Sequence, residues 1–256
     1  MAVNHIEGHI QAVVLEEKQK GNDVEFPALA LVVSGGHSHL VLADRREPAN
    51  YQYRLLGRTR DDAAGEAFDK VAKLLGFGYP GGPLIDKLAP LGEASRVKLP
   101  LTRMKGNPID MSFSGLKTAV LRYVRSAGMD EEIARRRRLF VQGRPESLEL
   151  ILEVTPQPTL DLLASFQQTV IEELLRRAWK AIENEDVRSV IVSGGVAANT
   201  GLRRSFAKLP CPVYFPSLAL ATDNAAMIAA AGYPRFERGE FASFDLRAQP
   251  SLSLAS

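Results

Sequence analysis

The chain has 256 residues and a formal net charge of +2, and its 45% hydrophobic and 24% charged residues are typical of an ordinary globular protein with one large or two modest domains. No segment approaches the about 18 apolar residues of a membrane span, and no signal-peptide pattern opens the chain, so no membrane partner is expected. Cys211 is the only cysteine and lies between two prolines with no base nearby. This indicates a structural thiol in a reducing, cytoplasmic compartment.

Hydrophobic periodicity predicts strands early in the chain and alternating strands and helices later, which indicates an α/β fold. Residues 131–149 give a weak signal, and the tail after Gly232 is polar. In the long helix, Leu162, Phe166, Val170, Leu174 and Trp179 are predicted to face the core. The predicted helices cover residues 3–19, 65–75, 84–88, 115–125, 160–184, 200–209 and 223–231, and the strands cover residues 29–33, 39–43, 52–56, 188–192 and 212–215.

Two predicted strands end in the same tripeptide. The first runs into Ser34-Gly35-Gly36, and the second runs into Ser193-Gly194-Gly195. Glycine pairs let backbone N–H groups approach a phosphate with no side chain in the way. The repetition favours a nucleotide held from two sides, while two unrelated turns are the alternative.

His5 and His9 are spaced as two ligands of one metal ion on a helix face, although a chance pair with this spacing is common. The spacing is not that of zinc metallopeptidases, because Glu7 stands two positions after His5 and faces roughly the opposite side. His37 and His39 are interpreted as solvent-facing strand residues.

Three carboxylates are candidates for ligand binding. Asp69 falls inside a helix, where aspartate is unfavourable, and could accept two ribose hydroxyls. Asp86, which follows the turn at Gly81 and Gly82, is a candidate of the same kind. Asp223 begins a helix, so it either caps that helix or completes a His-His-Asp metal site.

Basic residues gather in the middle of the chain. Four successive arginines, Arg135 to Arg138, form either a solvated helix face or part of a surface for a phosphate backbone. Further basic residues precede them, at Arg103, Lys105, Lys117, Arg122 and Arg125.

Seven stretches in this order resemble the TsaD family of bacterial tRNA threonylcarbamoyladenosine synthesis proteins, once labelled glycoproteases. They extend from residue 4 to about residue 232. They are Asn4-His5-Ile6-Glu7-Gly8-His9, Val32-Val33-Ser34-Gly35-Gly36-His37, residues 61–70, Tyr79-Pro80-Gly81-Gly82-Pro83, residues 113–118, residues 193–199 and residues 222–229.

The resemblance implies an actin-like, ribonuclease-H-like fold, in which two α/β lobes close on a nucleotide. Residues 1–22 would be the last helix of the first lobe. Residues 23–234 would form the second lobe, with a helical insertion at about 60–150, and residues 235–256 a tail. Family members carry a longer first lobe, so this lobe is expected to be largely missing here. The first helix would then expose an apolar patch at Ile6, Ile10 and Val13.

The resemblance also implies a site. His5, His9 and Asp223 would hold one divalent metal per subunit, iron or zinc, and no catalytic residue is assigned beyond them. Threonylcarbamoyl-adenylate or ATP would bind elsewhere in the cleft. The residues expected to bind this ligand are Val32, Val33, Ser34, Gly35, Gly36, Asp69, Gly82, Asp86 and Asn199.

The implied reaction moves the threonylcarbamoyl group from the adenylate to the exocyclic amine of the adenosine beside the tRNA anticodon. TsaB and TsaE are the expected protein partners, and the chain alone is expected to be inactive. A non-catalytic nucleotide-binding lobe in a larger assembly is the main alternative. A metallopeptidase is a weaker one, since Glu7 is misplaced for it.

Overall fold

The computed structural model describes residues 1–47, 50–141, 143, 145, 147–249, 252 and 254. Its centre is a five-stranded sheet with the order β3-β2-β1-β4-β5. The antiparallel strands are β1 (Ala28–Val33), β2 (Ser38–Glu47) and β3 (Asn50–Arg58), and β4 (Ser189–Ser193) and β5 (Val213–Tyr214) run parallel to β1. The predicted mixed α/β class is confirmed.

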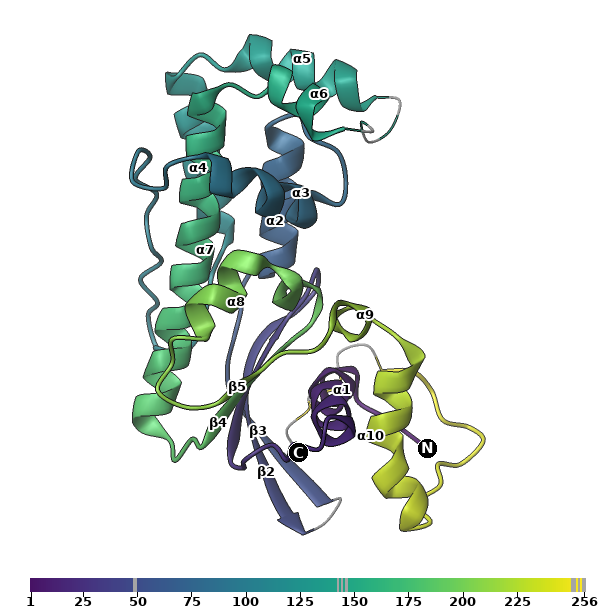
Figure 1. The fold of residues 1–256 in the computed structure, drawn as a ribbon. Helices are drawn as coiled ribbons and strands as arrows, with labels where there is room; N and C mark the ends of the chain where they lie inside the picture. The colour runs from purple at the N-terminus through teal and green to yellow at the C-terminus, as the bar shows by residue number, and fades with distance from the viewer. Residues whose placement is uncertain are drawn as a thin grey trace.

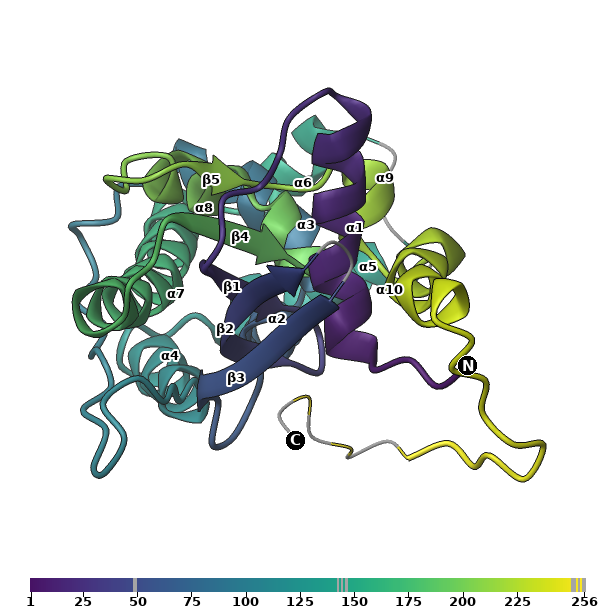
Figure 2. The same ribbon diagram turned by 90° about the horizontal axis from the view of Figure 1, so that it is seen from below.

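Helices cover both faces of the sheet (Figures 1 and 2). The helices before α7 are α1 (His5–Gln19), α2 (Ala64–Leu74), α3 (Gly81–Leu88), η1 (Ala89–Leu91), α4 (Ser114–Ser126), α5 (Asp130–Phe140) and α6 (Leu148–Glu153). The later ones are α7 (Gln157–Asn184), η2 (Gly195–Ala198), α8 (Thr200–Phe206), α9 (Leu218–Ala221) and α10 (Ala225–Glu237). None of the helices in the described part of the chain is long and apolar enough to cross a membrane.

The core has two parts, one on each face of the sheet. On one face, α1 packs through Ile6, Ile10 and Val13 against β1, β2 and β4, and α10 lies beside α1 (Figures 1 and 2). The larger part lies on the other face, where α7 and α2 bury Phe166 and Phe68. The expected exposed patch on the first helix is therefore wrong, because the sheet covers Ile6, Ile10 and Val13 to 6%, 0% and 0% exposure.

Among the differences between the predicted and the observed helices, two concern side chains and packing on α7 and α10. Trp179 is 39% exposed, because the buried stripe of α7 continues from Leu174 through Ala178 and Ala181, and Trp179 lies to one side of it. The last helix extends to Glu237, six residues beyond its predicted end at 231. Packing against α1 and an ion pair from Arg235 to Glu7 hold that added turn despite Pro234.

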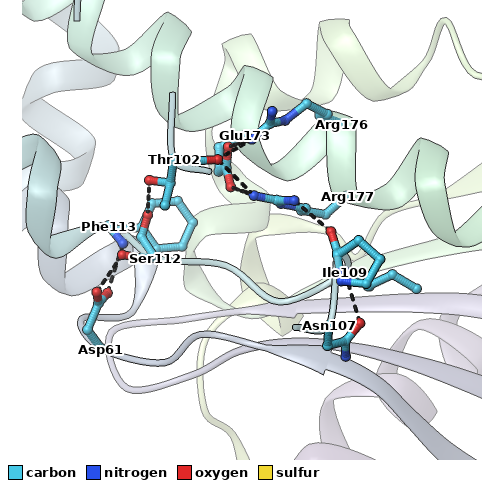
Figure 3. Close-up of polar contacts among 10 residues, drawn as sticks. Asp61, Thr102, Asn107, Ile109, Ser112, Phe113, Glu173, Arg176 and Arg177 are labelled. Carbon is cyan, nitrogen blue, oxygen red and sulfur yellow. Dashed lines mark hydrogen bonds and ion pairs between the residues drawn. The ribbon is translucent and has the colours of Figure 1, made fainter. Parts of the chain in front are cut away.

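A buried polar network fastens the long connection before α4 to α7 (Figure 3). Glu173 is 1% exposed and accepts from Arg176 at 2.7 Å and from Arg177 at 2.6 Å. Arg177 also donates to the carbonyls of Pro108 and Thr102, at 2.6 and 3.1 Å. Because the buried charges of Glu173 and Arg177 are paired with each other and hydrogen-bonded, the connection is held in one position over α7.

The interpretation of residues 135–138 as one basic face is wrong for Arg136. Its side chain points from α5 into the protein and is fully buried. Its Nε donates to the Leu75 carbonyl at 2.6 Å, and its Nη1 donates to the Val154 carbonyl at 2.9 Å. The guanidinium lies 5.2 Å from the centre of the Phe77 ring. Burial lowers the pKa of Arg136 to about 10, so it is still charged at neutral pH. It ties α5 to the ends of α2 and α6.

Arg136→Ala is expected to lower the free energy of unfolding by about 3 kcal/mol, since it creates a cavity and leaves two carbonyls without their donor. Urea denaturation measures the change. Arg137→Ala is the matched control, because this neighbouring arginine is exposed, and it should cost less than about 0.5 kcal/mol. Equal effects of the two substitutions would contradict a structural role for the buried guanidinium.

Candidate functional site

The structure brings together the three residues expected to hold a metal. His9 Nε2 lies 3.1 Å from Asp223 Oδ1, and His5 Nε2 lies 3.6 Å from the same oxygen. One ligand atom from each of the three residues lies within 4.8 Å of the others. The His9 ring is 1% exposed, and neither of its nitrogens has a hydrogen-bond partner despite the close carboxylate. An unpartnered buried nitrogen beside a second imidazole and a carboxylate fits a shared divalent ion.

Local structure explains why these residues meet. Asn4 caps α1 by accepting from the Ile6 N–H at 2.9 Å, which places His5 and His9 in the first turns. Asn224, and not Asp223, caps α10 by accepting from the Met227 N–H. The capping interpretation of Asp223 is thus wrong, and its carboxylate is free to face the histidines.

Glu7 has a structural partner on α10. It is 5% exposed and forms an ion pair with Arg235 at 2.9 Å. Gly8 lets the two helices approach, since a Cβ there would lie 3.2 Å from Ile228 and 3.3 Å from Met227. Glu7 therefore holds α10 against α1 and is outside the metal cluster, which argues against the metallopeptidase alternative.

His37 and His39 are not the solvent-facing residues that the sequence indicated. Both are partly buried, and the four histidines of the chain follow one another in space. The His37 ring lies 5.6 Å from that of His5 and 5.4 Å from that of His39. Burial lowers the pKa of His9 and of His37, and it lowers the pKa of His39 to about 4. These three imidazoles are consequently neutral at pH 7.

Two other glycines, Gly65 and Gly194, allow neighbouring segments to approach the first glycine turn closely. A Cβ on Gly65, at the start of α2, would lie 2.6 Å from the Ser34 carbonyl oxygen. A Cβ on Gly194, after β4, would lie 2.3 Å from the Val33 carbonyl oxygen. The second Ser-Gly-Gly segment therefore packs against the residue before the first, and the two segments follow adjacent parallel strands. In contrast, a Cβ on Gly35 or Gly36 would meet nothing within 4 Å, so both glycines face open space.

Asp69 and Gly82 lie at the contact between α2 and α3. The Gly81 N–H donates to Asp69 Oδ1 at 2.8 Å, which supplies the cap that Pro80 lacks. A Cβ on Gly82 would meet only Phe68, at 3.9 Å. Asp69 thus has a structural bond as well as remaining acceptor capacity for a ligand.

Asp86 and Asn199 belong to one hydrogen-bonded group at the start of α8. Asp86 accepts from the Thr200 N–H at 2.9 Å and from the Thr200 hydroxyl at 3.0 Å. Asn199 accepts from the Leu202 N–H and donates to Gln167, which in turn donates to Asp86 at 3.3 Å. Gln167 and Thr200 were not predicted from the sequence, because nothing local links them to Asp86.

Comparison with known proteins supports the resemblance to the TsaD family independently of the site geometry. The family model for TsaD, tRNA N6-adenosine threonylcarbamoyltransferase, matches residues 1–230. Proteins of that name from Koribacter versatilis (strain Ellin345), Gloeobacter violaceus (strain ATCC 29082 / PCC 7421) and Clostridioides difficile (strain 630) are 50%, 45% and 40% identical over 99% of this chain. The matches cover 71%, 65% and 67% of those relatives, so the chain spans about two thirds of their length.

A solved structure supports the fold. A crystal structure of full-length HypF in the phosphate- and nucleotide-bound form matches 94% of this chain and 44% of its own with a TM-score of 0.63, at 13% identity. At this identity the likeness concerns the fold alone. The family assignment depends on the close relatives and on the family model. The chain therefore belongs to the TsaD family, whose function is the threonylcarbamoylation of adenosine N6 in tRNA.

Proposed function

We propose that this chain carries the metal site and the donor site for threonylcarbamoyl transfer from threonylcarbamoyl-adenylate to the adenosine beside the tRNA anticodon. The observation that supports this most is the adjacency of the His5, His9 and Asp223 cluster to the first glycine turn. His37 directly follows Gly36, and its ring lies 5.6 Å from the His5 ring. A donor phosphate at the turn would thus lie beside the metal ligands.

His5, His9 and Asp223 would hold one divalent ion, iron or zinc. When bound, this ion would supply a Lewis acid for the carbonyl or phosphate oxygens of the donor. The end of β1 and the turn after it, residues 32–36, would receive the adenylate phosphate through their backbone, since no side chain covers Gly35 or Gly36. The free lone pairs of Asp69 would accept ribose hydroxyls, with Gly82 leaving room for the sugar. Asp86 and Asn199 would hold the start of α8 in place, at the edge of the donor site opposite Asp69.

The transfer forms a bond between the adenosine N6 and the carbonyl carbon of the donor. The bond from that carbon to the phosphate oxygen breaks, AMP leaves, and the amine loses one proton. ATP would bind at the same place as the adenylate. We also propose that residues 23–234 are the second lobe of an actin-like pair, that TsaB and TsaE are partners, and that the protein is cytoplasmic.

The test is a chimera in which residues 1–256 replace the matching region of the Koribacter versatilis relative. It is incubated with TsaB, TsaE, the synthetic donor and an unmodified tRNA transcript, and the digested tRNA is analysed by mass spectrometry. The expected result is threonylcarbamoyladenosine, lost on His9→Ala, with no product from residues 1–256 alone. If the folded chimera bound the donor but made no product, the alternative of a non-catalytic nucleotide-binding lobe would be the better hypothesis.

A further inference from the structure

On the exposed face of helix α4, every charged residue is a cation. Leu116, Val120 and Val124 face the core at 3%, 0% and 3% exposure. The helix has no acidic residue, and its three cations are all exposed. These are Lys117, Arg122 and Arg125.

Several exposed cations elsewhere on the protein are paired with carboxylates. Arg46 lies 2.9 Å from Asp44, Arg96 lies 2.7 Å from Glu93, and Lys180 lies 3.2 Å from Glu183. In the part of the chain that the structure describes, the three α4 cations have no such pair within 4.0 Å. Their positive charge is therefore available to a ligand.

A second cationic segment adjoins the start of α4. Arg103 and Lys105 are exposed and follow Thr102, whose hydroxyl donates to the Ser112 carbonyl at 2.9 Å. The Thr102 carbonyl also accepts from Arg177, so the segment is fixed between α7 and the start of α4 (Figure 3). We call Arg103, Lys105, Lys117, Arg122 and Arg125 together the α4 cationic surface.

This surface is connected to the first glycine turn by successive hydrogen bonds. Asp61 accepts from the backbone N–H groups of Phe113 and Ser114, at 2.8 and 3.3 Å, and so caps α4. Near Asp61, the Thr59 N–H donates to the Ser38 carbonyl at 2.8 Å. The Ser38 hydroxyl accepts from Ala64, the residue before Gly65, which contacts Ser34. The N-terminal end of α4 is thereby held at the same end of the sheet as the proposed donor site.

We propose that the α4 cationic surface binds the phosphate backbone of the tRNA whose adenosine is modified; this rests on the proposed function. From Lys117 to Arg125 the helix rises about 12 Å, enough to follow several phosphates of one strand. The three α4 cations lie within about 140° of its circumference, so one strand can meet them all. Phosphate contacts of this kind would orient the tRNA without reading its sequence.

The test measures the affinity of residues 1–256 for a fluorescent unmodified tRNA transcript by anisotropy, over a range of salt concentrations. The variant carries Lys117→Gln, Arg122→Gln and Arg125→Gln. The control carries Arg46→Gln, Arg96→Gln and Lys180→Gln, which removes the same charge from paired positions. We expect the variant to bind at least about tenfold more weakly at low salt and to lose about two units of salt slope. The control should lose less than about half a unit.

Equal losses in the two triple variants would overturn the proposal, because net charge alone would then explain binding. Absence of tRNA binding by the unsubstituted chain would overturn it as well. Thermal melting checks folding, and the double variant Arg122→Gln, Arg125→Gln replaces the triple if that unfolds. Calorimetry with the donor separates this inference from the proposed function. Donor affinity should be the same in both variants, and transfer by the chimera can succeed even if the α4 cationic surface plays no part.

Discussion

His9→Ala is expected to weaken metal binding by more than about 100-fold, because even the outer partners of metal ligands account for 10–100-fold in affinity. His9 is the only buried member of the cluster, at 1% side-chain exposure against 40% for His5 and 73% for Asp223. Its lowered pKa keeps the imidazole neutral at pH 7, so no proton competes with the ion. Without His9, only the two more exposed ligands, His5 and Asp223, remain.

Metal content per chain, measured after dialysis against a weak chelator, gives the result and also distinguishes iron from zinc. His39→Ala is the matched control, because His39 belongs to the same series of rings but lies outside the group that shares Asp223. It should retain the ion. If His9→Ala still bound one equivalent with unchanged affinity, the proposed ligand set would be wrong.

Local sequence was enough to predict several parts of this molecule. Alternating and helical periodicity located the main strands and helices, because burial on a sheet or helix face imposes that periodicity directly. The spacing of His5 and His9 fixed both imidazoles on one face of a helix. Asp223 was tied to them by the family resemblance, and its position just before α10 proves to be geometrically suited to the role.

Other features depend on contacts that no local pattern encodes. His37 approaches His5 because β1 and β2 pair with Val33 opposite Ser38 while α1 packs on that face of the sheet. Arg136 looks like its exposed neighbours in sequence, and it is buried only because α5 lies across the ends of α2 and α6. The Glu7–Arg235 pair joins residues 228 positions apart. Tertiary packing decides each of these.

Gly35→Val is expected to abolish donor binding while leaving the fold intact. A Cβ on Gly35 would meet nothing within 4 Å, so the protein itself has room for a larger side chain. The branched side chain would instead occupy the space through which a phosphate must approach the turn. Affinity for a non-reactive analogue of threonylcarbamoyl-adenylate, measured by calorimetry, should fall at least about 100-fold, which corresponds to about 2.7 kcal/mol.

Two other glycines separate loss of the ligand site from loss of the fold. Gly115→Val is the matched control, since a Cβ there also meets nothing within 4 Å but lies on α4, and donor affinity should not change. Gly194→Ala should instead lower the melting temperature, because Gly194 has a φ of +88° and its Cβ would lie 2.3 Å from the Val33 carbonyl oxygen. Unchanged donor affinity in a folded Gly35→Val protein would mean that the phosphate does not bind at this turn. A loss of melting temperature as large as that of Gly194→Ala would mean that the turn itself has no spare room.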